Sequence, residues 1–241
     1  MKKLLFTLEY PPQIGGVANY YYNLVKSWPN ENDIMVLDTS VSKNYNKLSF
    51  PHWFKKAVNL NKFISKNKIG HVIVGQILPL GPITYLASFL SNFNYSIVFH
   101  GLDYCQSQAI KRKKFISHLV LRRAENIFCA NSYLAKSISN DYPDLAKKIK
   151  IVNPCFEMPK LDLIDEKKLK AKYSLENKNI IFSVSRLVYR KGFDLVLKAL
   201  LILKEKNKEL FENTIYVLAG KGEELNNLKN IVTDYNLNDD V

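Results

Sequence analysis

The chain has 241 residues, of which 47% are hydrophobic and 24% are charged, a balance that excludes a disordered or a collagen-like protein. The net charge of +13 is uneven: residues 1–160 hold 21 Lys and Arg against 9 Asp and Glu, whereas residues 161–241 hold 14 against 13. A basic first part favours an anionic partner, which is a phosphorylated substrate, an anionic membrane surface or a nucleic acid.

The sequence predicts neither a membrane span nor secretion. Two prolines and a glycine interrupt residues 77–91, the nearest approach to the roughly 20 apolar residues of a spanning helix. Glu9 ends the first apolar run too early for a signal peptide. Cys105, Cys129 and Cys155 are odd in number and far apart, so we expect no disulfide framework and no C-x-x-C motif. We therefore expect a cytoplasmic protein.

Short apolar segments alternate with longer amphipathic ones over the first 153 residues, a pattern typical of a parallel sheet covered by helices. The predicted strands are 3–9, 33–38, 71–76, 95–100, 126–131 and 149–153. The predicted helices are 17–28, 54–66, 82–90, 106–124 and 132–141.

A linker is predicted at residues 154–165, which contain two prolines and few periodic apolar positions. The alternation then restarts with helix 166–173, strand 179–185, helix 193–206, strand 214–219 and helix 223–235. We expect one domain over residues 1–160 and a second over residues 161–241. Two strands leave sheet edges and apolar faces uncovered, so the second domain is expected to be incomplete.

In sheets of this kind ligands bind beyond the carboxyl ends of the strands, so the loops that follow strands are candidate sites. Gly15 and Gly16 precede a predicted helix, whose first N–H groups and dipole favour an anion. An ordinary glycine turn is the alternative. His100 and Asp103 follow another strand, and a histidine that titrates near neutral pH could donate to a sugar hydroxyl or to a developing charge. A structural histidine is the alternative here, and we expect the other three histidines to be surface or packing residues.

Two more candidate loops lie in the second part of the chain. Arg186 and Lys191 lie between a strand and a helix start, where a guanidinium and an ammonium could hold a diphosphate, although a solvated basic turn is the alternative. Gly220 and Gly222 follow the next strand and could let a flat base approach the backbone. The sequence has no D-x-D, H-E-x-x-H or G-x-S-x-G, so the motifs give no support to divalent-metal or serine hydrolase chemistry.

Taken together and in order, these loops resemble those of the retaining GT-B glycosyltransferases of family 4. The matching segments are 10–17 (YPPQIGGV), 100–103 (HGLD), 185–194 (SRLVYRKGFD) and 220–223 (GKGE). The resemblance implies an α/β protein of two Rossmann-like doubly wound domains, the first binding the acceptor and the second binding a nucleotide-diphosphate sugar.

The resemblance also implies roles for the candidate residues. Gly15 and Gly16 would lie against the donor's phosphate and sugar, His100 would contact the sugar, and Arg186 and Lys191 would hold the diphosphate. Asp103, Gly220 and Gly222 would complete the donor site. The resemblance further implies retention of configuration without a cofactor or a divalent metal, and an acceptor that is a saccharide or is linked to a lipid, as in cell-surface polysaccharide or lipopolysaccharide biosynthesis.

The sequence departs from the family at two points. Ser185 stands where the family often has glycine. The family's paired-glutamate motif, whose carboxylates engage the donor sugar and ribose, is not found before Val241. We therefore expect the sequence to be the N-terminal part of a longer enzyme, inactive on its own.

A different reading is a basic α/β module that binds an anionic membrane or a nucleic acid and catalyses nothing. Lys111 to Lys114, with Arg122 and Arg123, support it, because they share a predicted helix with apolar residues. A solvated helix face explains the same cluster, and no nucleic-acid motif accompanies it. Saturable binding of a nucleotide sugar would distinguish the enzyme from the module.

Overall fold

The computed structural model describes residues 1–39, 50–154 and 165–241. The chain forms two compact units, Met1–Met158 and Pro159–Val241. Among the described residues, no helix combines the length and the apolar character that crossing a membrane requires.

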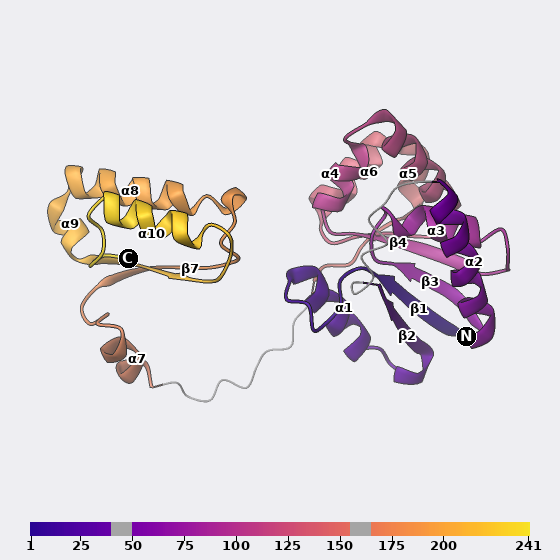
Figure 1. Cartoon of the computed structure of the whole chain (residues 1–241), viewed down its shortest axis with the longest axis horizontal. Helices are drawn as coiled ribbons and strands as arrows, with labels where there is room; N and C mark the ends of the chain where they lie inside the picture. The colour runs from indigo at the N-terminus through magenta and orange to yellow at the C-terminus, as the bar shows by residue number, and fades with distance from the viewer. Residues whose placement is uncertain (40–49, 155–164) are drawn as a thin grey trace. The chain divides into compact units, whose positions relative to one another are not determined.

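The first unit is built on a parallel sheet of six strands in the order β2-β1-β3-β4-β5-β6 (Figure 1). The strands are β1 Lys2–Thr7, β2 Ile34–Asp38, β3 Ile69–Val74, β4 Asn94–Phe99, β5 Ile127–Cys129 and β6 Ile149–Ile151. All six are where the apolar segments predict them, with ends that differ by at most two residues.

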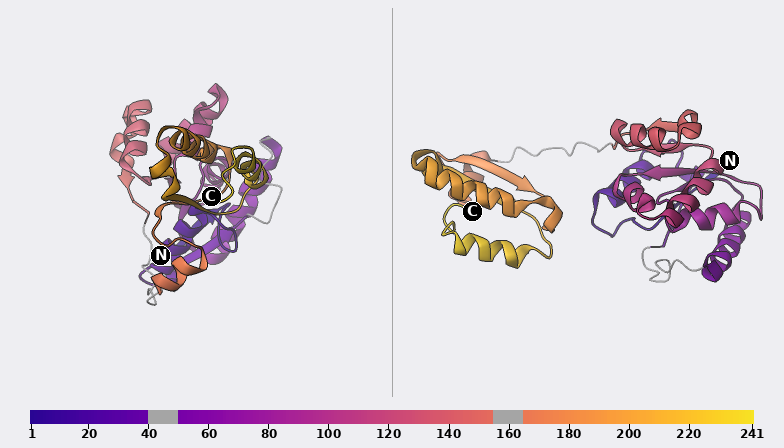
Figure 2. Two further views of the ribbon diagram at one scale, coloured as in Figure 1. Left: turned by 90° about the vertical axis from the view of Figure 1, so that its left-hand side faces the viewer. Right: turned by 90° about the horizontal axis from the view of Figure 1, so that it is seen from above.

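Helices cover both faces of this sheet (Figure 2). They are α1 Gly16–Lys26, α2 Phe50–Asn67, α3 Leu80–Ala87, α4 Leu102–Gln108, α5 Lys111–Arg123 and α6 Ser132–Asp141, with 3₁₀ turns at Glu31–Asp33 and Pro143–Lys148. Because side chains alternate along a strand, β1 buries Leu4 and Phe6 in one core cluster and Leu5 in another. The cluster with Leu5 contains Tyr20 and Tyr21 of α1.

The single helix predicted over residues 106–124 is wrong. The chain instead forms α4 and α5, separated at Ile110, whose backbone is extended with φ −139° and ψ 147°. In one straight helix Lys111 and Lys114 would continue the buried stripe of Tyr104 and Ser107 into the core. The break leaves both lysines in solvent.

The second unit has one parallel pair of strands, β7 Asn179–Val184 and β8 Thr214–Ala219. Its helices are α7 Glu166–Lys172, α8 Phe193–Lys206, α9 Lys208–Glu212 and α10 Leu225–Asp234, with a 3₁₀ turn at Tyr189–Lys191. The predicted bounds of α8 and β8 match those observed, whereas the short α9 is not predicted. Leu197, Leu200 and Tyr216 form the centre of its core.

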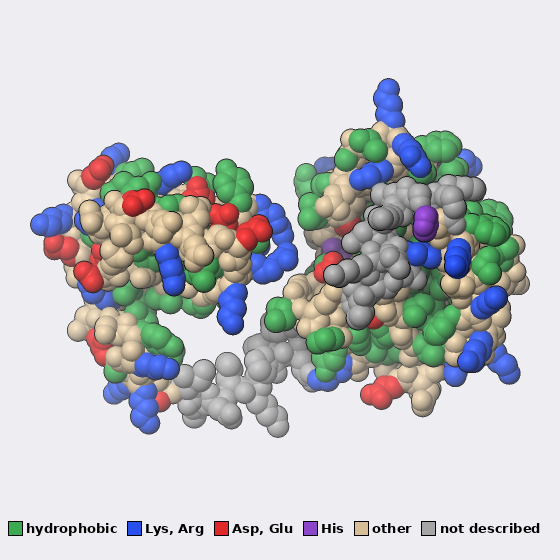
Figure 3. Space-filling model, in the orientation of Figure 1, with side chains coloured by type: hydrophobic (Ala, Val, Ile, Leu, Met, Phe, Trp, Pro, Cys, Tyr) green, Lys and Arg blue, Asp and Glu red, His purple; other side chains and the backbone are tan. Residues whose placement is uncertain are grey.

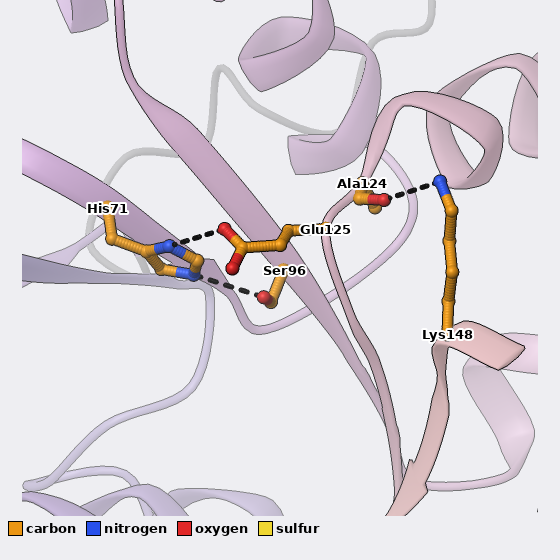
Figure 4. Close-up of polar contacts among 5 residues, drawn as sticks. All are labelled: His71, Ser96, Ala124, Glu125 and Lys148. Atoms are coloured by element: carbon orange, nitrogen blue, oxygen red, sulfur yellow. Dashed lines mark hydrogen bonds and ion pairs between the residues drawn. The ribbon is translucent and has the colours of Figure 1, made fainter.

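A cluster of polar side chains lies at the amino-terminal edge of the first sheet. Figure 4 shows His71 of β3 with its Nε2 3.0 Å from Ser96 Oγ and its Nδ1 3.4 Å from a carboxylate oxygen of Glu125. Nearby, the Lys148 ammonium donates to the carbonyl of Ala124, just after α5 ends. His71 is thus a packing residue, as its position in the sequence predicts.

Candidate functional site

In the first unit, the candidate residues gather where the strand order reverses. β1 lies between β2 and β3, and α1, which follows β1, packs on one face of the sheet, whereas α2 and α3 pack on the other. Ligands bind beyond the carboxyl ends of strands at such a point. The loops after β1, β3 and β4 all lie along this edge (Figure 1). They carry Gly15 and Gly16, Gly75 and Gln76, and His100 and Gly101.

The loop after β1 ends at the start of α1. The Asn19 N–H donates to the Gly15 carbonyl at 3.0 Å, which begins the helix and leaves the earlier N–H groups without a helical acceptor. No acidic residue lies in the first turn, and the N-cap, Gly15, has no side chain to cap it. A carboxylate oxygen of Glu9 lies 3.8 Å from the position of a Cβ at Gly15. A Cβ added at Gly16 would meet no atom within 4 Å, so the space beside this glycine is open. These features suit an anion that approaches the backbone closely.

His100 is held by two tyrosines of α1. Its Nε2 lies 2.9 Å from the Tyr21 hydroxyl, and its ring makes edge contacts with the rings of Tyr20 and Tyr21 at centroid distances of 4.8 and 5.2 Å. Burial lowers the pKa of His100 to about 4. The expectation that this histidine titrates near neutral pH is therefore wrong, and its ring is neutral at pH 7.

Asp103 shapes the loop that carries His100. Its carboxylate accepts hydrogen bonds from the backbone N–H groups of His100 at 3.1 Å and Gly101 at 2.8 Å. Gly101 has φ 125°, a conformation that side chains disfavour, so glycine is needed at this turn. Burial raises the pKa of Asp103, and the backbone hydrogen bonds oppose that rise. Its contact with a donor stays a prediction.

Sequence reasoning missed the residues that join the loops after β1 and β3. Gln76 is buried, and its side-chain oxygen accepts from the Leu8 N–H at 2.8 Å. The buried Thr7 hydroxyl accepts from the Glu9 N–H at 3.1 Å and lies 3.3 Å from Gln76 Nε2. A polar residue at the end of an apolar run, two positions after β3, was the available signal for Gln76. Nothing in the local sequence indicates that Tyr21 reaches His100.

In the second unit, the loops that follow β7 and β8 pack backbone against backbone. The Leu187 N–H donates to the Lys221 carbonyl at 2.9 Å, and the Glu224 N–H donates to the Leu187 carbonyl at 3.0 Å. A Cβ at Gly220 would lie 2.0 Å from the Ser185 carbonyl oxygen, and one at Gly222 would lie 2.1 Å from that of Leu187. The packing of the two loops therefore requires glycine at both positions, and the approach of a base stays a prediction.

The paired loops carry four exposed cations, of which Lys191 lies next to the start of α8. Arg186, Arg190, Lys191 and Lys221 are all exposed, and among the described residues none of them forms an ion pair. Gly192 adopts the left-handed conformation, φ 68° and ψ 29°, directly before α8 begins at Phe193. The loop thus brings unpaired positive charge next to a helix N-terminus, where an anion is favoured.

The sequence comparisons point to glycosyltransferases. Residues 165–241 match the family model "Glycosyl transferases group 1". The chain is 22% identical over 248 residues to the uncharacterized glycosyltransferase YqgM of Bacillus subtilis (strain 168). That match covers 100% of the chain and 65% of the relative, so the chain spans about two thirds of the relative's length.

Solved structures show the same architecture. Anabaena Alr3699/HepE in complex with UDP superposes with a TM-score of 0.71 at 17% identity, over 100% of this chain and 68% of that one. The apo lipopolysaccharide outer core galactosyltransferase WaaB gives 0.67 at 14% identity, over 99% and 66%. A glycosyltransferase from Rickettsia africae ESF-5 gives 0.66 at 17% identity, over 99% and 66%. The predicted fold class is confirmed: the chain has the α/β fold, with parallel sheets, of the GT-B glycosyltransferases.

Proposed function

We propose that this chain is part of a glycosyltransferase that moves a sugar from a nucleotide-diphosphate sugar to an acceptor. The observation that carries the proposal is the position of the unpaired cations. Arg186 and Lys191 lie in the loop that leads from β7 to α8, inside the segment that matches the glycosyl transferases group 1 model. The HepE structures, which hold UDP or UDP-glucose, support a nucleotide-sugar donor.

Donor binding is assigned to the second unit. The Arg186 guanidinium can grip phosphate oxygens with two parallel hydrogen bonds, and the Lys191 ammonium adds a point charge. The N-terminus of α8 adds backbone N–H groups to the same place. Together these groups would hold the diphosphate, while His100, Gly15 and Gly16 would contact the sugar and phosphate from the first unit.

Catalysis would come from charge stabilisation. As the bond between the sugar and the diphosphate breaks, negative charge grows on the leaving group, and preorganised cations stabilise that charge more than they stabilise the ground state. The resemblance to family 4 supports retention of configuration, with the acceptor attacking the face that the diphosphate leaves and with no divalent metal or other cofactor.

The acceptor is assigned to the first unit, in cell-surface polysaccharide or lipopolysaccharide biosynthesis. A saccharide or lipid-linked acceptor at the inner face of the cytoplasmic membrane fits the excess of basic residues over residues 1–160. Figure 3 shows Lys and Arg predominating over Asp and Glu on the visible face of this unit. The alternative is a basic module without catalysis, which the exposed Ile110 and Phe115 beside Lys111 to Lys114 also fit.

The test is calorimetric titration of the chain with UDP. We expect saturable binding that Arg186→Ala or Lys191→Ala weakens by roughly tenfold or more, because each loses a charge-assisted contact. Lys206→Ala is the matched control, because Lys206 is an exposed lysine at the C-terminal end of α8, far from the N-terminus that Lys191 precedes. Absence of UDP binding by the folded chain, or an equal loss of affinity in all three variants, would contradict the assignment of Arg186 and Lys191 to the diphosphate. It would favour the basic module without catalysis.

A further inference from the structure

Three groups from separate parts of the first unit form a hydrogen-bonded row that ends at the His100 ring. Tyr21 of α1 is fully buried, and its hydroxyl lies 2.7 Å from the carbonyl oxygen of Gly75, just after β3. The same hydroxyl lies 2.9 Å from Nε2 of His100, just after β4. The row therefore joins a carbonyl, a phenol and an imidazole by two hydrogen bonds.

The protons in this row can be assigned from the chemistry of the three groups. A carbonyl oxygen only accepts, so the single hydroxyl proton of Tyr21 is donated to Gly75. The contact between the Tyr21 oxygen and His100 then needs a proton from the histidine, which must lie on Nε2. A neutral imidazole carries one ring proton, so Nδ1 has none and is an acceptor.

We propose that Tyr21 is a positioning residue that fixes His100 in the tautomer protonated at Nε2. Any hydrogen bond that the His100 ring makes with a ligand then uses Nδ1 as acceptor, and the ligand must supply the donor. A sugar hydroxyl is such a group, and only this identification rests on the proposed function. The expected role of His100 as a donor to the sugar is thereby reversed.

The surroundings of the row are built for this arrangement. A Cβ at Gly75 would lie 3.0 Å from the Tyr21 hydroxyl and 2.8 Å from Thr7 Oγ1, so a side chain there would push the phenol away from the carbonyl. The rings of Tyr20 and Tyr21 stand at 79° and 84° to the imidazole, which restricts its rotation. Burial keeps the pKa of His100 at about 4, so the ring is neutral over the working range.

The experiment is NMR of the 241-residue chain labelled with ¹⁵N in its four histidines. His100→Gln assigns the His100 signals by their loss. In the wild-type protein we expect a protonated Nε2, an unprotonated Nδ1 and a slowly exchanging Hε2 with an Overhauser contact to the Tyr21 ring. In Tyr21→Phe we expect this proton to exchange with water roughly tenfold faster or more, because its acceptor is gone.

Tyr22→Phe is the matched control, because Tyr22 is the next residue of the helix and is 45% exposed. It should leave the Hε2 exchange rate unchanged. A wild-type His100 ring protonated at Nδ1 would overturn the proposal without Tyr21→Phe, so failure of that variant to fold does not protect it. Equal Hε2 exchange in wild type and in a folded Tyr21→Phe would overturn it as well. None of these readouts requires donor binding or transfer activity.

Discussion

The environment of a single side chain decides the charge on His100. Its ring is packed against two tyrosines and donates a hydrogen bond from Nε2–H to the hydroxyl of one of them, so a second ring proton would be poorly solvated. That cost is why burial lowers the pKa to about 4. The residue is thus unsuited to proton transfer near pH 7, and suited to orienting a hydroxyl.

The shifted pKa makes the stability of the first unit depend on pH. Between pH 6.5 and about 4 the unfolded chain binds a proton on His100 and the folded chain does not, so stability falls as pH falls through this window. From pH 7 to 4.5, wild type should lose on the order of 2 kcal/mol more unfolding free energy than His100→Gln.

Urea unfolding followed by tryptophan fluorescence measures this, because both tryptophans, Trp28 and Trp53, lie in the first unit. The comparison with the variant removes the contributions of His71, whose pKa burial also lowers, and of Asp103, whose pKa burial raises. Equal losses in the two proteins would show that His100 is not buried as described.

Close packing at Gly222 leads to a second prediction for a single residue. Gly222→Ala places a methyl group 2.1 Å from the Leu187 carbonyl oxygen, and the two loops must separate to admit it. We expect it to destabilise the second unit by about 1 to 3 kcal/mol. Hydrogen exchange of the β8 amides should rise accordingly.

Gly16→Ala is the control for this prediction, because its added methyl group meets no atom within 4 Å. The unfolding free energy of the first unit should change by no more than about 0.5 kcal/mol in this variant. Unchanged β8 exchange in Gly222→Ala would contradict the close packing of the two loops.

At the scale of the elements, β7 leaves its apolar side chains largely exposed. The register pairs Ile181 with the buried Tyr216, whereas Phe182 pairs with Val217 and Val184 with Ala219 on the opposite face. Phe182 is 61% and Val184 is 71% exposed. One face of the pair therefore packs on α8 and α10 (Figure 1), while the other presents apolar side chains to solvent.

An open apolar face next to an edge strand favours association between chains. We expect the chain to self-associate with rising concentration, and the double variant Phe182→Ser with Val184→Ser to do so less, because the face becomes polar. Sedimentation velocity over a range of concentrations is the measurement. Ile202→Ser, which removes an exposed apolar side chain from α8, should associate like wild type. Identical behaviour of all three proteins would contradict a role for this face.

The elements were the most predictable level of the structure, because their signals are local. Periodic apolar residues predicted the observed bounds of α6 and α8, and short apolar runs predicted each strand found in the described residues. The break at Ile110 depends on what α4 and α5 pack against, which no local pattern contains. The bond between Tyr21 and His100 joins residues 79 positions apart, so the sequence indicated a histidine in a loop and not its neutral state.

For the molecule as a whole, the excess of positive charge lies in the first unit. Residues 1–160 carry 21 basic against 9 acidic side chains, and α5 concentrates Lys111, Arg112 and Lys114 in solvent with Phe115, which is 64% exposed. Basic residues close to an anionic leaflet contribute about 1 kcal/mol each, and salt screens them. This composition favours a peripheral, salt-sensitive association of the first unit with membranes.

We expect the chain to cosediment with anionic vesicles and not with neutral ones, and to be released as salt rises. Replacing Lys111, Arg112, Lys113 and Lys114 by Gln should weaken binding by at least about tenfold, since four favourable charges are lost. Replacing Lys167, Lys168, Lys170 and Lys172 of α7 by Gln removes the same charge from the second unit and should have a much smaller effect. Equal losses in both variants would mean that net charge alone, and not α5, directs binding.

The polar cluster at the amino-terminal edge of the first sheet shows why geometry alone does not identify a catalytic site. At the amino-terminal edge, Ser96 Oγ, the His71 ring and the Glu125 carboxylate follow the order and nearly the spacing of a hydrolase triad. Ser96 is fully buried, so no ester or amide carbonyl could reach its oxygen for nucleophilic attack. A search for catalytic triads that compares only interatomic distances would select this cluster. A search that also requires a substrate to reach the serine oxygen would reject it.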